Sequence, residues 1–289
     1  MPKKHIEKTP VQVLLTPAYI ITTGKILTAT SPFLASRFVA RLFFTPFRYK
    51  LPNREKEMDK KSIQETINIP SIRREIVVYK YGTGPKKVLL VHGWSGTGTQ
   101  LSIIAKELVN KGFSVISFDA PAHGKATGKT SMMPFFIESI HHIEKEYGPF
   151  EVAIGHSLGG MSLLKAIKNG FRVNKLILIG TANSVTHITR EFVKNMKLNE
   201  KVAELMKAYF DKKFGEDMDN YSGAFSAESV KVETLVVHDK NDIDVHISSA
   251  HEIVDKLENG KLFVTEGLGH RRILGNPDVI NKISTFITE

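Results

Sequence analysis

From about residue 63 onward, short apolar stretches with the composition of β-strands alternate with stretches of helical periodicity. Val88–Val91 (VLLV), Ser114–Phe118 and Lys175–Ile179 are largely apolar at successive positions, which is typical of strands buried on both faces. Between the strands lie amphipathic segments such as Gln100–Lys111 and Pro134–Tyr147, each followed by glycine. The alternation predicts an α/β protein with a mostly parallel central sheet and helices on both faces.

One stretch interrupts this rhythm. Between Ser184 and Val232 the sequence shows no convincing strand, and residues 188–214 have a helical composition. We therefore expect a helical cap insertion at about residues 185–231, over the carboxyl edge of the sheet. Loops at that edge are where ligands and catalytic groups sit in sheets of this kind.

The segment Gly155-His156-Ser157-Leu158-Gly159 matches the pattern G-x-S-x-G. It follows the predicted strand Phe150–Ile154 and precedes a predicted helix, which is the context that a nucleophile elbow requires. Such a turn exposes the serine hydroxyl at a helix N-terminus, where backbone N–H groups favour developing negative charge. Ser157 is therefore the candidate nucleophile.

A serine hydroxyl needs a base to take its proton, and the base needs a carboxylate to orient it. His270 follows the last predicted strand, Lys261–Val264, and is the candidate base. Three carboxylates, Asp239, Asp242 and Asp244, follow the strand before it. The order serine, acid, histidine is the order in which such triads occur on α/β sheets.

The oxyanion of an acyl-transfer reaction needs hydrogen-bond donors. His92-Gly93-Trp94 follows the strand Val88–Val91, and its loop can bring the Trp94 N–H towards the nucleophile. The N–H of Leu158, directly after the serine, is the second candidate donor.

With these residues in view, the chain resembles the α/β-hydrolase superfamily, in particular its lipase- and esterase-like members with a small helical cap. The resemblance covers about residues 63–289 and rests on five motifs in the family's order, which are VHGW, FDAPAHG, GHSLGG, VVHDKNDIDV and GLGH. It implies that Ser157 is the nucleophile, His270 the base and Asp242 the orienting acid. It also implies oxyanion-hole amides at Trp94 and Leu158. Asp239 stands where the family usually has glycine, so Asp239 and Asp244 remain alternative acids.

The expected function is that of a serine hydrolase that cleaves carboxylic esters through an acyl-enzyme intermediate, with no metal or organic cofactor. Two alternatives stay open. One is a non-catalytic ligand-binding or scaffold protein of the same fold. The other is a thioesterase, amidase or carbon–carbon hydrolase that uses the same triad.

Residues 1–61 differ from the expected hydrolase domain, residues 62–289. They hold twelve Lys/Arg and four Asp/Glu, a net charge of +8, whereas the remaining 228 residues carry only +2. Apolar stretches interrupted by Pro10, Pro17 and Pro32 lie within them. The segment is expected to pack on the body or over the mouth of the site, and next to lie in a membrane interface. A cleaved signal peptide or a membrane span is the least expected.

The partners follow from these features. A small-molecule ester is the expected substrate, and the basic, apolar N-terminal segment suggests a lipidic one such as a monoacylglycerol or lysophospholipid. The nearly neutral body argues against a nucleic-acid partner. The chain has no cysteine, which fits a cytoplasmic protein, peripheral at the inner face of the membrane. The sequence does not predict an oligomeric state.

Overall fold

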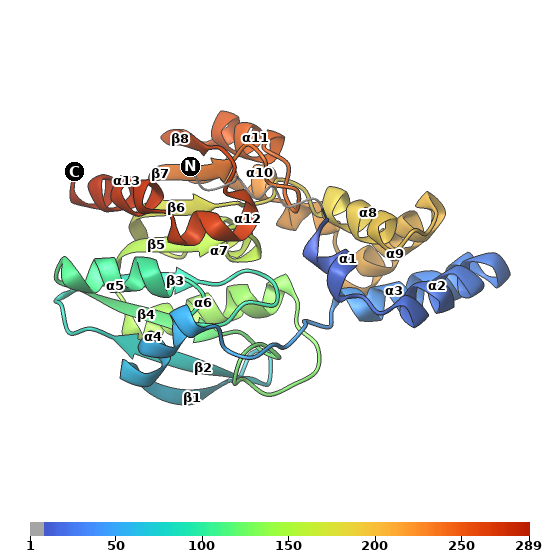
Figure 1. The fold of residues 1–289 in the computed structure, drawn as a ribbon, viewed down its shortest axis with the longest axis horizontal. Helices are drawn as coiled ribbons and strands as arrows, with labels where there is room; N and C mark the ends of the chain where they lie inside the picture. The colour runs from blue at the N-terminus through green and yellow to red at the C-terminus, as the bar shows by residue number, and fades with distance from the viewer. Residues whose placement is uncertain (1–8) are drawn as a thin grey trace.

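The centre of the molecule is one twisted sheet, seen in a computed structural model that describes residues 9–289 (Figure 1). Within these residues the sheet has eight strands in the order β1-β2-β4-β3-β5-β6-β7-β8. β2 pairs antiparallel with β1 and with β4, and all other neighbours are parallel, which confirms the predicted mostly parallel sheet. The strands are β1 (Ile63–Ile69), β2 (Arg74–Tyr81), β3 (Lys86–Val91), β4 (Phe113–Asp119), β5 (Phe150–His156), β6 (Val173–Ile179), β7 (Glu233–Asp239) and β8 (Gly260–Thr265).

The apolar runs of the central strands reflect burial on both faces of this sheet. In β3, Val88 and Leu90 point into one hydrophobic core, and Leu89 and Val91 point into the other. All four are at most 1 % exposed. Because successive side chains of a strand point to opposite faces, a strand covered on both sides must be apolar at every position.

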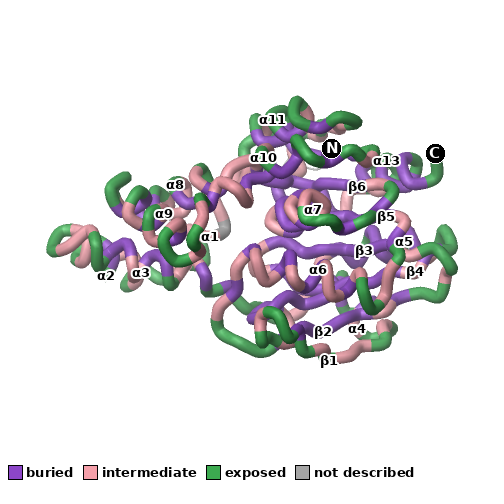
Figure 2. The backbone as a smooth tube through the Cα atoms, turned by 180° about the vertical axis from the view of Figure 1, so that it is seen from behind, coloured by how far each residue is buried: buried purple, intermediate pink, exposed green. Residues whose placement is uncertain are grey.

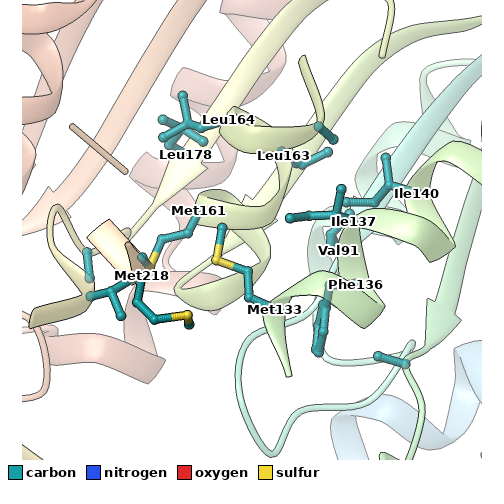
Figure 3. Close-up of a cluster of buried hydrophobic side chains, with 14 of the residues drawn as sticks. Val91, Met133, Phe136, Ile137, Ile140, Met161, Leu163, Leu164, Leu178 and Met218 are labelled. Carbon is teal, nitrogen blue, oxygen red and sulfur yellow. The ribbon is translucent and has the colours of Figure 1, made fainter. Parts of the chain in front are cut away.

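Helices cover both faces, as predicted. The core that contains Val88 and Leu90 is closed by side chains of α4, α5 and α13, and the opposite core by side chains of α6, α7, α10 and α11. Met133 and Phe136 of α6 gather with Met161 of α7 and Val91 of β3 in this second core (Figure 3). The bounds are α4 (Lys56–Lys61), α5 (Ser102–Asn110), α6 (Met133–Tyr147), α7 (Leu158–Lys168), α10 (Gly223–Ala227), α11 (Ser248–Lys256), α12 (Gly269–Arg272), the 3-10 helix η3 (Ile273–Gly275) and α13 (Pro277–Thr288).

Between β6 and β7 the chain leaves the sheet and forms α8 (Val185–Asn195), α9 (Glu200–Phe214) and the 3-10 helix η2 (Met218–Tyr221) before α10. The side chains of Ser184 and Asn199 accept hydrogen bonds from N–H groups in the first turns of α8 and α9. Each side chain therefore satisfies a donor that the helix leaves unpaired. In Figure 1 both helices lie beyond one edge of the sheet, next to the N-terminal helices.

The N-terminal segment is helical and is broken near its prolines. α1 (Val11–Leu15) ends before Pro17, and α2 (Ala18–Thr30) ends before α3 (Pro32–Phe43). α3 packs on α9, and just beyond its end the ring of Phe44 lies 4.7 Å from that of Phe210. No helix in residues 9–289 is both long enough and apolar enough to cross a membrane.

The charged stretch from Pro52 to Ser62, which reads in sequence as a linker or an exposed helical turn, forms the 3-10 helix η1 (Asn53–Glu55) and α4, and most residues of α4 are exposed. Met58 is buried in the core beneath α5, and Glu55 is fully buried. The boundary between residues 61 and 62, like the cap role of about 185–231, stays a prediction.

Candidate active site

Ser157 lies in the tight turn between β5 and α7. Its φ of 52° and ψ of −119° are backbone angles that residues other than glycine rarely adopt. Glycine allows the neighbouring backbone to come close, because a Cβ on Gly159 would lie 2.3 Å from the Val91 carbonyl oxygen. The Ser157 N–H is held by the carbonyl of Ile179 at 2.9 Å. The turn therefore fixes Ser157 at the carboxyl end of β5, where it is half-buried.

His270 and Asp242 meet at the same edge of the sheet. His270 belongs to the short helix α12 after β8, and Asp242 lies in the loop after β7. His270 Nδ1 lies 2.7 Å from Asp242 Oδ2. The other carboxylate oxygen of Asp242 accepts hydrogen bonds from the N–H groups of Asp244 and Val245, so its orientation is set by its own loop. The structure thus joins two of the predicted site residues through one hydrogen bond.

The environment of His270 favours its protonated form. Burial disfavours a charged ring and opposes this, but the hydrogen bond and negative charge of Asp242 outweigh burial and raise the pKa of His270. The neighbouring His156 ring, with its centroid 4.6 Å away, behaves in the opposite way. Burial, together with the proximity of His270, lowers the pKa of His156 well below its usual range. Of the two neighbouring rings, His270 is therefore the one suited to take up a proton.

Ser157 and His270 are not joined by a hydrogen bond. In the described part of the chain, the Ser157 hydroxyl has no hydrogen-bond partner at all. His270 is tied to the elbow through His156, because His156 Nε2 lies 3.0 Å from the His270 carbonyl oxygen. Gly180, next to Ile179, leaves room for the ring, since a Cβ there would lie 3.1 Å from His270 Nδ1. Catalytic hydrogen bonds often tighten only when substrate is bound, so this arrangement is compatible with proton transfer.

The two other aspartates have different contacts. Asp239 accepts hydrogen bonds from the Leu268 N–H at 2.9 Å and the Thr265 hydroxyl at 2.7 Å. Burial raises its pKa, but N–H donors from the His270 loop and the Thr265 hydroxyl outweigh burial and lower it. Asp244 lies 3.7 Å from the Arg271 guanidinium. Asp239 thus holds the loop that carries His270, whereas Asp242 holds the ring itself.

The loop after β3 carries the predicted amide donor of Trp94. The preceding N–H, that of Gly93, is occupied by Gln100 Oε1 at 2.8 Å. Within residues 9–289, the backbone N–H groups of Trp94 and Leu158 donate no hydrogen bond to another protein group.

His92 fixes the start of this loop. Its Nε2 accepts from the Ala120 N–H at 3.0 Å, so Nδ1 carries the proton and donates to the Gly93 carbonyl at 2.7 Å. Burial lowers the pKa of His92 to about 4, so the ring stays neutral. Among the described residues, no group of three or more His, Cys, Asp or Glu side chains is arranged to hold a metal ion.

The sequence reasoning missed the residues that support this loop. Glu55, fully buried, accepts hydrogen bonds from the hydroxyls of Thr97 and Thr99 at 2.8 and 3.0 Å. The Phe47 N–H donates to Ser95 Oγ at 2.9 Å. No local pattern could have revealed these contacts, because each joins residues more than 40 positions apart. Glu55 also lies in a charged stretch, where a carboxylate is expected to be exposed.

Comparison with known proteins supports the architecture. A family model described as the alpha/beta hydrolase fold matches residues 86–199. No curated protein matches the chain. Similar solved structures include an esterase from Pyrococcus furiosus, which is 17% identical with a TM-score of 0.65 over 85% of this chain and 97% of that chain. An esterase from Exiguobacterium antarcticum is 17% identical with a TM-score of 0.62 over 78% and 100%.

A bromoperoxidase from Bacillus anthracis is also 17% identical, with a TM-score of 0.60 over 78% of this chain and 99% of that chain. At these identities the structural likeness concerns the fold alone. The family match spans β3 to α8 and thus includes the Ser157 elbow. Together with the strand order and the similar solved structures, it shows that the chain has the α/β-hydrolase fold.

Proposed function

We propose that the protein is a serine hydrolase that cleaves carboxylic esters through an acyl-enzyme intermediate. The observation that carries the proposal is the 2.7 Å contact between His270 and Asp242 at the sheet edge that bears the Ser157 turn. A buried imidazole that a carboxylate orients, at the same sheet edge as a serine in a tight turn, is the arrangement that activates a hydroxyl for attack.

In the proposed reaction, the Ser157 side chain rotates so that its hydroxyl reaches His270 Nε2. His270 takes the hydroxyl proton while Ser157 Oγ attacks the ester carbonyl carbon. The N–H groups of Trp94 and Leu158 donate to the resulting oxyanion. Asp242 keeps the proton of the neutral ring on Nδ1 and stabilises the imidazolium that forms.

Protonated His270 then gives its proton to the leaving alcohol, and the acyl group stays on Ser157. Water, deprotonated by His270, attacks the acyl carbon and releases the carboxylic acid, which restores the serine. No step needs a group beyond these side chains, two amides and water.

The ester class is favoured because several proteins with similar structures are named as esterases or serine hydrolases. A similar structure is also named as a thioesterase domain, and the same triad can cleave thioesters, amides or carbon–carbon bonds. A lipidic ester, such as a monoacylglycerol or lysophospholipid, fits the basic and apolar N-terminal segment. The cytoplasmic location, at the inner face of a membrane, stays a prediction.

Labelling with a fluorophosphonate, followed by intact-mass measurement, tests the proposal without knowledge of the substrate. We expect one adduct on the wild-type protein and none on Ser157→Ala. Wild-type protein that is folded by circular dichroism but takes up no label would contradict the proposal and favour the ligand-binding alternative. If labelling succeeds, a series of esters, thioesters and amides of matched acyl chains identifies the bond that is cleaved.

A further inference from the structure

The exposed large apolar side chains of this protein are concentrated in its N-terminal segment. In the described chain there are twelve of them, and eight lie between residues 14 and 49. Isolated exposed apolar residues are normal on a protein surface, but such a concentration marks a contact surface. The eight residues are Leu14, Leu15, Tyr19, Ile26, Phe33, Leu34, Phe47 and Tyr49.

The helical hairpin of α2 and α3 has one packed face and one bare face. In α2, Gly24 is buried against Leu198, whereas Tyr19 and Ile26 are 71% and 60% exposed. In α3, the side chains that face α9 are buried, whereas Phe33 and Leu34 at its start are each 53% exposed. Figure 2 shows this hairpin extending away from the sheet, with largely exposed and intermediate colouring. The apolar groups on its bare face are therefore left uncovered by the rest of residues 9–289.

The charge of the same segment has one sign. Residues 8–54 contain seven Lys/Arg and no Asp or Glu. Lys25 and Arg41, on α2 and α3, are exposed. The Arg37 guanidinium lies over the rings of Phe33 and Tyr209, at 4.5 and 3.9 Å, so the cation sits beside an exposed aromatic ring. Basic groups interleaved with exposed aromatic and aliphatic groups on short helices are suited to an anionic lipid surface.

We propose that α1, α2 and α3 form a docking surface for an anionic phospholipid bilayer. The helices lie in the interfacial layer, with Tyr19, Ile26, Phe33 and Leu34 among the acyl chains near the headgroups. Lys25 and Arg41 pair with lipid phosphates. The charge of this surface favours an anionic bilayer over a second copy of the chain. Two such surfaces, each basic and without acidic residues, would repel each other.

The chain that follows the docking surface is hydrogen-bonded to loops of the candidate active site. Directly after α3, the Phe47 N–H is bonded to Ser95, the neighbour of Trp94. Arg48 donates to the carbonyls of Ala122 and Ala126 in the loop region after β4. A docked hairpin therefore keeps the candidate site close to the lipid. The docking itself does not depend on whether Ser157 is a nucleophile.

Vesicle flotation with the full-length protein tests the proposal. The vesicles are phosphatidylcholine alone, or phosphatidylcholine with phosphatidylglycerol, at low and high salt. We expect binding to the anionic vesicles and weakening by salt. Ile26→Gln should weaken binding about three- to tenfold, because one aliphatic side chain is lost from the lipid. Ile63→Gln, which changes an isoleucine 67% exposed on β1, is the matched control and should leave binding unchanged.

The charge contribution is tested separately. The double variant Lys25→Gln/Arg41→Gln should weaken binding to anionic vesicles by roughly 10- to 30-fold, because each basic group near the surface contributes about fivefold. Lys231→Gln/Lys282→Gln removes the same charge from exposed positions outside the hairpin and should have little effect. All four variants should keep wild-type hydrolysis of a short, water-soluble ester, or wild-type fluorophosphonate labelling.

Three results would overturn the docking proposal. One is equal binding to neutral and anionic vesicles, or none to either. Another is equal weakening by Ile26→Gln and Ile63→Gln. The third is a dimer in light scattering that Ile26→Gln dissociates, which would assign the surface to a second copy. Loss of labelling with intact vesicle binding would instead count against the proposed hydrolase reaction alone.

Discussion

The carboxyl edge of the sheet and the N-terminal segment both join residues that are distant in the sequence, but they do so in different ways. At the sheet edge, Ser157, Asp242 and His270 each follow a parallel strand, so the strand order brings them together. In the N-terminal segment, Glu55 and Phe44 meet their partners only through tertiary packing. The difference shows that the positions of residues at strand ends can be predicted from the sequence. The contacts of an N-terminal segment that packs on the sheet and helices cannot.

The largest expected effect concerns the sheet edge. Ser157→Ala removes the proposed nucleophile and should lower kcat by about 10⁴–10⁶-fold, with the free energy of unfolding nearly unchanged. Steady-state hydrolysis of the best ester from the substrate series measures the change, with thermal unfolding of the same protein as control. Activity near that of wild type would mean that the strand-end pattern predicts the fold of this edge but not its chemistry.

The next effect tests the contact between Asp242 and His270. Because Asp242 raises the pKa of His270, kcat/KM of the wild type should fall as pH drops through a value above the ordinary histidine pKa of about 6.5. Below that value the ring is protonated and cannot act as a base. Asp242→Asn should lower kcat by roughly 10³–10⁴-fold and move this acid limb to lower pH.

Asp239→Asn is the matched control for this test, since Asp239 bonds the loop rather than the ring. It should leave the position of the acid limb nearly unchanged, whatever it does to stability. A shift of the limb in Asp239→Asn but not in Asp242→Asn would make Asp239 the orienting acid.

A smaller effect, on stability, tests how firmly the N-terminal segment belongs to the fold. Phe44 is 7% exposed and packs against Phe210 of α9. Phe44→Ala should lower the free energy of unfolding by about 3–5 kcal/mol, as buried phenylalanines do when truncated. Phe47→Ala, with a side chain 37% exposed, should change it by less than about 0.5 kcal/mol. If the urea unfolding curves of Phe44→Ala and Phe47→Ala are the same, the segment does not unfold together with the body.

The same contrast explains what the sequence could and could not predict. Apolar runs such as that of β3 predicted the sheet and its two covered faces, because burial on both sides leaves a simple pattern. The G-x-S-x-G segment predicted the position of the Ser157 turn between β5 and α7. The burial of Glu55 could not be predicted, since a carboxylate in a run of charges looks exposed until its hydroxyl partners are known. The preference of His270 for Asp242 over Asp239 likewise depends on loop geometry that spacing alone left open.

The smallest effect joins the two regions. Glu55, from the N-terminal segment, accepts from Thr97 and Thr99 in the loop that carries Trp94. Glu55→Gln keeps the shape but replaces one acceptor oxygen by a donor, so we expect a loss of about 1–2 kcal/mol in unfolding free energy. A looser loop should also lower kcat by roughly 3- to 10-fold with little change in KM, because the amide acts mainly on the transition state.

Glu57→Gln is the control, because this exposed carboxylate pairs with Lys61 and Lys106 at the surface, where such pairs contribute little. If Glu55→Gln and Glu57→Gln behave alike in both kcat and stability, the loop is rigid without the N-terminal segment. The two regions would then be independent in function. If only Glu55→Gln lowers kcat, the extension is part of what holds the candidate oxyanion donor in place, and the site cannot be understood from the strand ends alone.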